Sequence, residues 1–279
     1  MAIDLTTKFL PYVDEQFTAE SKKSLITNND FDWTGAHTVK VYKISTSKMN
    51  DYDRSGNGLN RSRFGEIKGL DATTEEFTLT QDRSFTFAID KLDTDETQAQ
   101  LAGASALARQ NREVVIPEVD SYIYNVMCDN AGNKPAPIEL SSGNIYTEII
   151  KAGTALDDEC IPDTGRILLV TPAVYALMKK SPDIVMETDI GTDMRAKGVI
   201  AMLDGCNVIK VPASRLPEHF GFMIAHPSAT VAPVKLEDYR IHQDPPGISG
   251  SLVEGRICYD AFVLDNKKNA IYYQELAVK

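Results

Sequence analysis

The residues that could carry out catalysis are few, and none completes a catalytic motif. The segment GISGS, residues 247–251, approaches the GxSxG turn of serine hydrolases, but its first serine is not followed by one residue and then glycine. The segment SGNGLN, residues 55–60, has two glycines of a dinucleotide-binding loop, but Arg61 stands where the third belongs. The sequence therefore predicts no nucleophile elbow and no phosphate-binding loop, and we expect no enzymatic activity.

Candidate metal ligands are scattered along the chain. The four cysteines form no CxxC pair, and the four histidines never stand at HxH or HxxxH spacing. Acidic pairs such as Asp93 with Asp95, and Glu75 with Glu76, are expected to cap helices or face solvent rather than to transfer protons. We predict no metal site, no cofactor and no catalytic residue, with the cysteines reduced in a cytoplasm.

One cluster of charged residues is a candidate for contacting a partner. Arg54, Arg61 and Arg63 lie in a polar stretch, residues 50–65, that is rich in glycine, asparagine, aspartate and serine, and Lys68 follows it. Such a stretch has too little apolar area to offset its own ordering entropy. Two interpretations remain open. The stretch is a solvated surface loop, or a partner orders it and its arginines pair with carboxylates of an adjacent chain.

The composition is that of a globular protein, and its charge limits the partners. The 279 residues are 43% hydrophobic and 25% charged, with a net charge of -11, and this length predicts two lobes. An acidic surface neither wraps DNA nor binds an anionic membrane, because phosphate binding needs clustered lysine and arginine. The sequence begins with no basic segment followed by an apolar one, and no stretch approaches the ~18 apolar residues of a membrane span. We expect neither a cleaved signal nor a membrane segment.

A hairpin and a long helix are the elements that must position these residues. Alternating strands are predicted over residues 37–47 and 75–90, on either side of the polar stretch. A helix is predicted from Thr94 to about Ala131, with a kink or break at Pro117. Such a helix of about 35 residues is about 50 Å long at 1.5 Å per residue. Hairpin and helix are too extended for a compact core of their own, which predicts a part that reaches a neighbouring subunit.

The remaining chain predicts an N-terminal arm, a mixed lobe and a return to strands, and hence an α+β fold. The arm, residues 1–36, carries a short amphipathic helix. In the mixed lobe we expect helices from Ile145 and Pro172. Strands are predicted over residues 166–171, 199–203, 207–211, 221–225, 231–241, 251–264 and 270–274. The last two strands are expected to form a hairpin around the polar turn DNKKN.

In this order the elements resemble the HK97-type fold of the major capsid proteins of tailed bacteriophages. The resemblance covers nearly the whole chain and is one of architecture, with no chemical motif. It is carried by KFLPYVDEQFTAESKKSL, TLTQDRSFTFAID, GVIAMLDGCNVIKVP, GFMIAHPSA and GRICYDAFVLDNKKNAIYY.

The resemblance implies a role for each segment. Residues 1–36 would be the N-terminal arm, residues 37–90 the extended E-loop hairpin, and residues 91–144 the spine helix and peripheral (P) domain. Residues 145–230 would be the axial (A) domain, and the strands of residues 231–279 would return to and close the P domain. The inter-subunit contact candidates are then Arg54, Arg61, Arg63 and Lys68.

The implied function is structural: self-assembly into an icosahedral shell that encloses phage double-stranded DNA. The partners would be other copies of the chain, in pentamers and hexamers, with separate scaffolding, portal and decoration proteins and only non-specific contact with DNA. Only about 36 residues precede the first strand, so scaffolding is expected from another protein or from the arm. The protein would be made in the cytoplasm of a bacterial host and reside in the virion capsid.

Some proteins of this fold join their subunits through an isopeptide bond between lysine and asparagine. Lys68 and either Asn266 or Asn269 are available here, but neither a pairing nor a promoting glutamate can be identified from the sequence, and we expect no cross-link. Two alternative functions remain: an encapsulin-like nanocompartment shell, and an α/β enzyme without a recognisable motif.

Overall fold

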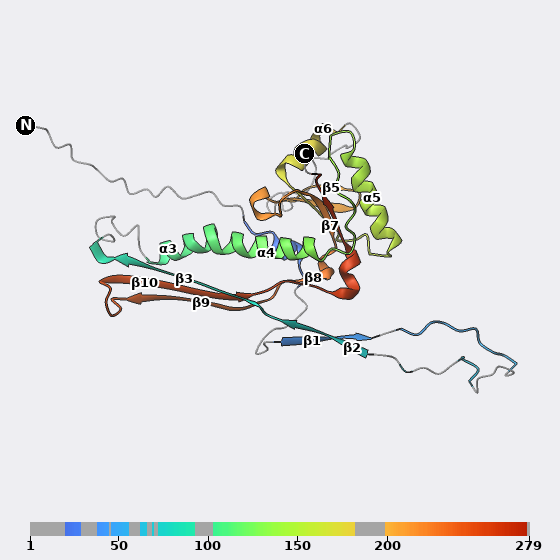
Figure 1. The fold of residues 1–279 in the computed structure, drawn as a ribbon, viewed down its shortest axis with the longest axis horizontal. Coiled ribbons are helices and arrows are strands. Elements are labelled where there is room, and N and C mark those ends of the chain that lie inside the picture. Colours follow the sequence, from blue (N-terminus) through green and yellow to red (C-terminus); the bar gives the residue numbers. More distant parts are fainter. Residues whose placement is uncertain are drawn as a thin grey trace, which may run out of the picture. The chain divides into compact units, whose positions relative to one another are not determined.

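The computed structural model describes residues 20–28, 38–44, 46–55, 62–65, 69, 72–92, 103–181 and 199–277. Most of the predicted arm, together with Arg61, Lys68 and the predicted start of the long helix, lies outside these residues. The chain divides into two compact units (Figure 1). We call residues 33–79 the hairpin unit, and residues 1–32 with 80–279 the body.

The hairpin unit contains two antiparallel strands, β1 (Thr38–Ile44) and β2 (Ala72–Thr78). Thr38 lies opposite Thr78, and their hydroxyl oxygens are 3.0 Å apart. Lys43 and Glu75 form an ion pair at 3.3 Å. The predicted pairing across the polar stretch is therefore present. A two-stranded ribbon of this kind is at best marginally stable alone in water.

The third strand, β3 (Gln81–Asp90), belongs to the body and not to the hairpin. It pairs with β10 (Gly250–Tyr259), and β10 pairs with β9 (Val234–Gln243). The expected hairpin of residues 37–90 therefore ends at Leu79. The alternating apolar residues of β3 explain the difference, because Phe85 packs on the body's core and beside Tyr239 of β9.

The long helix is continuous through the proline that was expected to break it. Helix α3 (Gly103–Gln110) leads through a π-helical turn, Asn111–Val115, directly into α4 (Ile116–Asp129). The Ile116 N–H donates to the carbonyl of Asn111, five residues earlier. This wider turn places Pro117 in the first turn of α4, where its missing N–H costs little. The predicted break at Pro117 is wrong for this reason.

A five-stranded sheet forms the centre of the mixed lobe. Its order is β12-β7-β4-β6-β5, with β4 (Ile167–Val170), β5 (Val199–Leu203), β6 (Cys206–Lys210), β7 (Phe220–Ala225) and β12 (Ile271–Glu275). Leu168 and Val170 face α5 (Ile145–Asp158) and α6 (Pro172–Lys180), whereas Ile167 and Leu169 join the core cluster that includes α4. A strand buried on both faces explains the unbroken apolar run of β4.

Local residue chemistry accounts for several boundaries in this lobe. The Thr171 hydroxyl accepts a hydrogen bond from the Val174 N–H at 3.2 Å, which caps α6 as Pro172 predicted. Asp204 and Gly205 both have positive φ angles, 49° and 73°, as a two-residue hairpin turn between β5 and β6 requires. The predicted helices from Ile145 and Pro172 are confirmed.

The predicted C-terminal hairpin is wrong. Strand β12 pairs with β7 in the five-stranded sheet, whereas β10 pairs with β3 and β9. Between them lie the short strand β11 (Phe262–Val263), paired with β8 (Thr230–Val231), and a 3₁₀ turn at Asp265–Ala270. Residues 271–274 are all buried, which suits a sheet covered on both faces and not an open hairpin. Residues 231–279 therefore divide between two larger sheets.

The layers of the body follow from these pairings. The α3–α4 helix lies along the three-stranded sheet β3-β10-β9, and α5 and α6 cover one face of the five-stranded sheet (Figure 1). Within the described part of the chain, no helix is both long and apolar enough to cross a membrane.

Candidate interaction site

The hairpin unit exposes large apolar side chains that its own residues leave uncovered. Tyr42 is 72% exposed, Met49 99%, Tyr52 54% and Phe64 78%. Tyr42 lies on β1, and the other three lie in the stretch between β1 and β2. Exposed apolar side chains that gather in one segment are typical of a surface that contacts another molecule. We call these four residues the apolar set.

The described parts of the polar stretch have some internal order. The Asp53 N–H donates to the Arg63 carbonyl at 2.9 Å, and the Asn50 side-chain amide donates to the Phe64 carbonyl at 3.4 Å. The rings of Tyr52 and Phe64 meet edge to face, with centroids 5.1 Å apart. These contacts bring the two ends of the stretch together and hold an aromatic pair at the surface.

The predicted contact residues are only partly described. Arg54 and Arg63 are exposed, and the bond between Asp53 and Arg63 brings their two backbone segments side by side. Arg61 and Lys68 lie outside the described residues. A contact with a neighbouring chain remains a prediction for all four. The charge pattern of the sequence does not indicate the apolar set, although Met49, Tyr52 and Phe64 stand out as apolar residues among polar ones.

The outer face of the three-stranded sheet is charged. Across the strands Glu254 lies opposite Arg240, and Arg256 lies opposite Asp238. The Arg256 guanidinium also donates twice to Asp82, at 2.9 and 2.5 Å. These hydrogen bonds lower the pKa of the exposed Asp82 carboxyl below its usual 3.8. The face carries paired surface charges, which contribute little to stability and are screened by salt.

We expect Asp82→Asn to lower the thermal unfolding midpoint slightly at neutral pH and to have no effect in acid. The Asp82 pKa is depressed in the folded chain, so its pair with Arg256 stabilises the fold above pH 3.8. That stabilisation is lost as the pH falls through the folded-state pKa. Thermal melts of both proteins at neutral and acid pH measure the effect. A difference that persists in acid would contradict the assignment.

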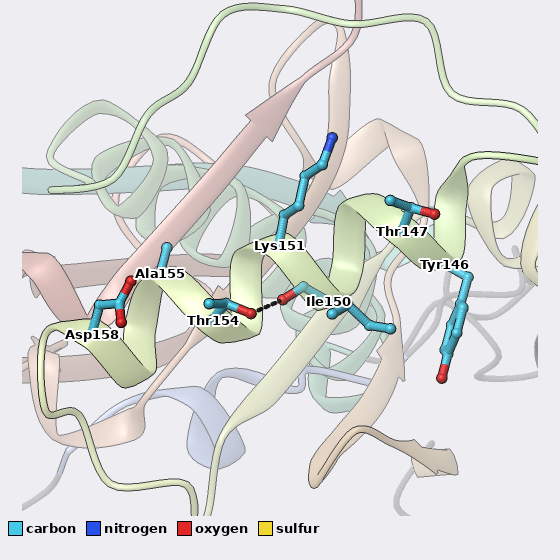
Figure 2. Close-up of a pocket in the computed structure, with 7 residues that line it drawn as sticks. All are labelled: Tyr146, Thr147, Ile150, Lys151, Thr154, Ala155 and Asp158. Carbon is cyan, nitrogen blue, oxygen red and sulfur yellow. Dashed lines mark hydrogen bonds between the residues drawn. The ribbon is translucent and has the colours of Figure 1, made fainter.

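A shallow groove runs along α5, and Figure 2 shows that its lining comes from this one helix. The Thr154 hydroxyl donates to the Ile150 carbonyl at 3.0 Å, and Lys151 pairs with Glu148 at 2.6 Å. The surface of a single helix cannot enclose a small molecule as binding pockets do. The lining offers neither a cysteine nor a histidine. It consists of Tyr146, Thr147, Ile150, Lys151, Thr154, Ala155 and Asp158.

The described residues contain no group of three or more histidine, cysteine or acidic residues placed to hold a metal ion. Burial raises the pKa of the Cys206 thiol to about 11 and that of Cys128 to about 12. Both thiols are therefore protonated at neutral pH and poor nucleophiles. The geometry offers extended surfaces for contact and no assembled set of catalytic groups within the described ranges.

Comparison with known proteins gives matches in structure alone. No protein-family model and no curated protein matches the sequence. A structure from Mycobacterium phage Che8 superimposes with a TM-score of 0.76 at 16% identity, covering 97% of this chain and 96% of that one. The capsid structure of cyanophage P-SCSP1u gives 0.75 at 13% identity, covering 98% and 93%. The chain has the HK97-type fold of phage capsid proteins.

The capsid fold extends over both units of the chain. The mature capsid of bacteriophage PhiM1 matches with a TM-score of 0.71 at 12% identity, covering 98% of this chain and 92% of that one. Because identity is so low, the shared property is the arrangement of elements and not particular contact residues. The resemblance in the sequence is thus confirmed for the mixed helix-and-sheet capsid fold.

Proposed function

We propose that this protein is a phage major capsid protein, a structural subunit without enzymatic activity that self-assembles into an icosahedral shell around double-stranded DNA. The observation that carries the proposal is the match of nearly the whole chain to phage capsid structures. The apolar set supports the proposal, because a second copy of the chain in a shell would cover these exposed side chains.

The roles of the segments follow within this proposal. The hairpin unit, residues 33–79, acts as the E-loop and lies over a neighbouring subunit. The continuous helix of residues 103–129 acts as the spine of the P domain, together with the three-stranded sheet. The lobe around the five-stranded sheet acts as the A domain. We propose these boundaries in place of the expected ones at residues 90 and 230.

The proposed partners are other copies of the chain, in pentamers and hexamers, with separate scaffolding, portal and decoration proteins. DNA is contacted without sequence specificity, and the net charge of -11 opposes tight adhesion to it. The protein would be made in the cytoplasm of a bacterial host and reside in the virion capsid. An encapsulin-like nanocompartment is less favoured, because the similar structures described above come from phages. The described residues form no site that would support an enzymatic function.

Negative-stain electron microscopy and sedimentation of the purified protein test the proposal. We expect closed shells or rings of capsomers. Nuclease-protected DNA inside shells from phage-producing cells would distinguish a phage shell from a nanocompartment. A stable monomer or dimer that never assembles, alone or with co-expressed neighbouring gene products, would contradict the proposal.

We expect no covalent cross-link between subunits. The Asn269 side-chain amide donates to Glu159 at 3.1 Å, so the group that a cross-link would use is engaged within its own chain. The Asn133 side-chain amide holds the same residue by donating to the Asn269 backbone carbonyl at 2.8 Å. Asn266 is exposed. Assembled particles, boiled in denaturant and separated by electrophoresis, should give one band at 30.8 kDa. A ladder of multiples that disappears in an Asn269→Ala or Asn266→Ala variant would contradict this expectation.

A further inference from the structure

The residues that flank the hairpin unit are both held by the body. The unit begins at Trp33 and ends at Leu79. Thr80 follows it directly, and Asn28 is the last described residue before it. Each of the two donates its backbone N–H to a fixed acceptor, Thr80 to Asp260 at 2.7 Å and Asn28 to the Thr230 carbonyl at 2.7 Å.

The anchor at Thr80 is a buried carboxylate with every oxygen engaged. Asp260 is 3% exposed. Its Oδ2 accepts from the Thr80 N–H and, at 2.9 Å, from the Thr80 hydroxyl. Its Oδ1 accepts from the Tyr122 hydroxyl at 2.7 Å and from the Ala261 N–H at 2.8 Å. A buried carboxylate is tolerated only when hydrogen-bonded in this way, and the bonds fix the position of each donor.

The anchor before the hairpin unit centres on a second buried carboxylate. Asp120 accepts from the Ser21 hydroxyl at 2.6 Å and from Arg215 at 2.8 Å. Arg215 also donates to the Glu20 carbonyl at 3.4 Å. Ile26, 1% exposed, lies in the core between this contact and Asn28. The segment of residues 20–28 is thus held by charge, by apolar burial and by a backbone bridge to β8.

Both anchors rest on the same small part of the body. Asp120 and Tyr122 stand two residues apart on α4. Strand β8, which Asn28 joins, pairs with β11, which follows Asp260 and Ala261. The Asp260 N–H donates to the Pro233 carbonyl at 3.1 Å, which closes the connection between these two segments. We call this group of α4, β8, β11 and Asp260 the anchor node.

We propose that the anchor node fixes the two segments of the body that flank the hairpin unit, residues 20–28 and Thr80, to one place in the body, with Asp120 and Asp260 as its positioning residues. A packed core needs neither carboxylate, since apolar groups of similar shape stabilise a fold as well as buried charges do. The carboxylates instead fix positions. Asp260 accepts from Thr80, which directly follows the hairpin unit, and Asp120 accepts from Ser21 in the segment that precedes it. Each carboxylate also binds a group elsewhere in the body. Any consequence for shell assembly rests on the proposed function, but the anchoring itself is a property of the single chain.

Hydrogen exchange of the unassembled full-length chain, followed by peptide mass spectrometry, tests the anchoring. In Asp260→Asn we expect exchange of peptides that contain Thr80 in their interior to rise about tenfold or more, because the amide offers one oxygen acceptor where the carboxylate offers two. In Ser21→Ala the peptide of residues 22–28 should exchange faster. Strands β4 and β7 should not change in either variant. Glu148→Gln, which removes the surface ion pair with Lys151 on α5 and lies outside the anchor node, is the control and should leave both flanking peptides unchanged.

Should Asp260→Asn fail to fold, Thr80→Val and Tyr122→Phe each remove one hydroxyl that bonds to Asp260, and we expect a smaller increase in exchange at Thr80. The proposal is overturned if exchange rises evenly over the whole body, or if the control raises it at Thr80 as much as the node variants do. Because the measurement uses unassembled chain, a wild-type protein that never forms shells would refute the proposed function and leave this result standing.

Discussion

Deleting residues 51–65 and joining the ends with a short glycine-serine linker is expected to give a folded, soluble chain that forms no stable shells. The body contributes the two larger sheets and both core clusters, and the deleted residues belong to neither cluster. Strands β1 and β2 lie outside the deletion and can still pair. Circular dichroism and thermal melting should therefore match the wild type, whereas electron microscopy should show unassembled subunits or capsomers.

The physical reason is the loss of contact surface that is repeated in every subunit. Burying one large apolar side chain contributes about 1.5–3 kcal/mol, and the deletion removes the exposed rings of Tyr52 and Phe64. In a shell each chain is tied to several others, so small losses per contact add up across the lattice. If the deletion variant assembled normally, the stretch would be a solvated loop with no role in the shell.

Point variants separate the apolar contribution of this stretch from its charge. Tyr52→Ser with Phe64→Ser removes the exposed aromatic pair, and Arg54→Gln with Arg63→Gln removes two exposed charges of the same stretch. Exposed ion pairs contribute only about 0–1 kcal/mol each. We therefore expect the aromatic variant to impair assembly more than the arginine variant does. If the arginines form no ion pair, the milder defect of the arginine variant should not depend on salt concentration. An arginine variant that failed completely, beside a normal aromatic variant, would reverse this order.

The sequence predicted the elements well where a single residue or a local period decides them. Helix α6 begins at Pro172 as expected, and Asp204 with Gly205 forms the turn between the strands expected over residues 199–203 and 207–211. The partners of strands were predicted less well. The alternation in β3 indicates that one face of the strand is buried, but not which strand lies beside it. Residues 251–264 and 270–274 are close in the sequence, which favoured a hairpin, but the burial of β12 on both faces excludes it.

The candidate interaction site could also be predicted only in part from the sequence. Charge in the polar stretch was visible in the sequence, but the exposure of Tyr42 or Phe64 follows only from the arrangement of the chain. The carboxylates of the anchor node were indistinguishable from other acidic residues. Asp120 meets Arg215 across 95 positions, and Asp260 meets Thr80 across 180. No spacing rule connects residues at such distances, so their roles require the fold.

Replacing Arg215 by methionine is expected to lower the free energy of unfolding by about 3–5 kcal/mol at neutral pH, the cost of leaving a buried charge without its partner. The side chains of Arg215 and Asp120 are 5% and 1% exposed, and their charged atoms lie 2.8 Å apart. Methionine fills a similar volume, so the loss reports on the charge and not on a cavity. Urea denaturation of both proteins measures it.

The loss of stability in Arg215→Met should become smaller in acid, and the direction of this change follows from the pKa of Asp120. Burial raises the pKa of its carboxyl, while the bonds to Ser21 and Arg215 oppose that rise. A carboxyl whose pKa is higher in the folded chain stabilises the fold when protonated, so its contribution is fully present below pH 3.8 and is lost as pH rises through the folded-state pKa. Without Arg215 this pKa rises further. The variant should therefore regain stability relative to the wild type as the pH falls from neutral towards that range.

The double variant Asp120→Asn with Arg215→Met decides whether the pair acts as a buried unit. With both charges removed, no unpaired ion remains, and we expect most of the loss seen in Arg215→Met to be recovered. If the two side chains behaved as an exposed pair, each single change would cost under about 1 kcal/mol and the effects would simply add. Recovery in the double variant, together with faster local exchange over residues 20–28, would mean that the ion pair holds the segment before the hairpin in place, while the apolar core alone accounts for the stability of the body.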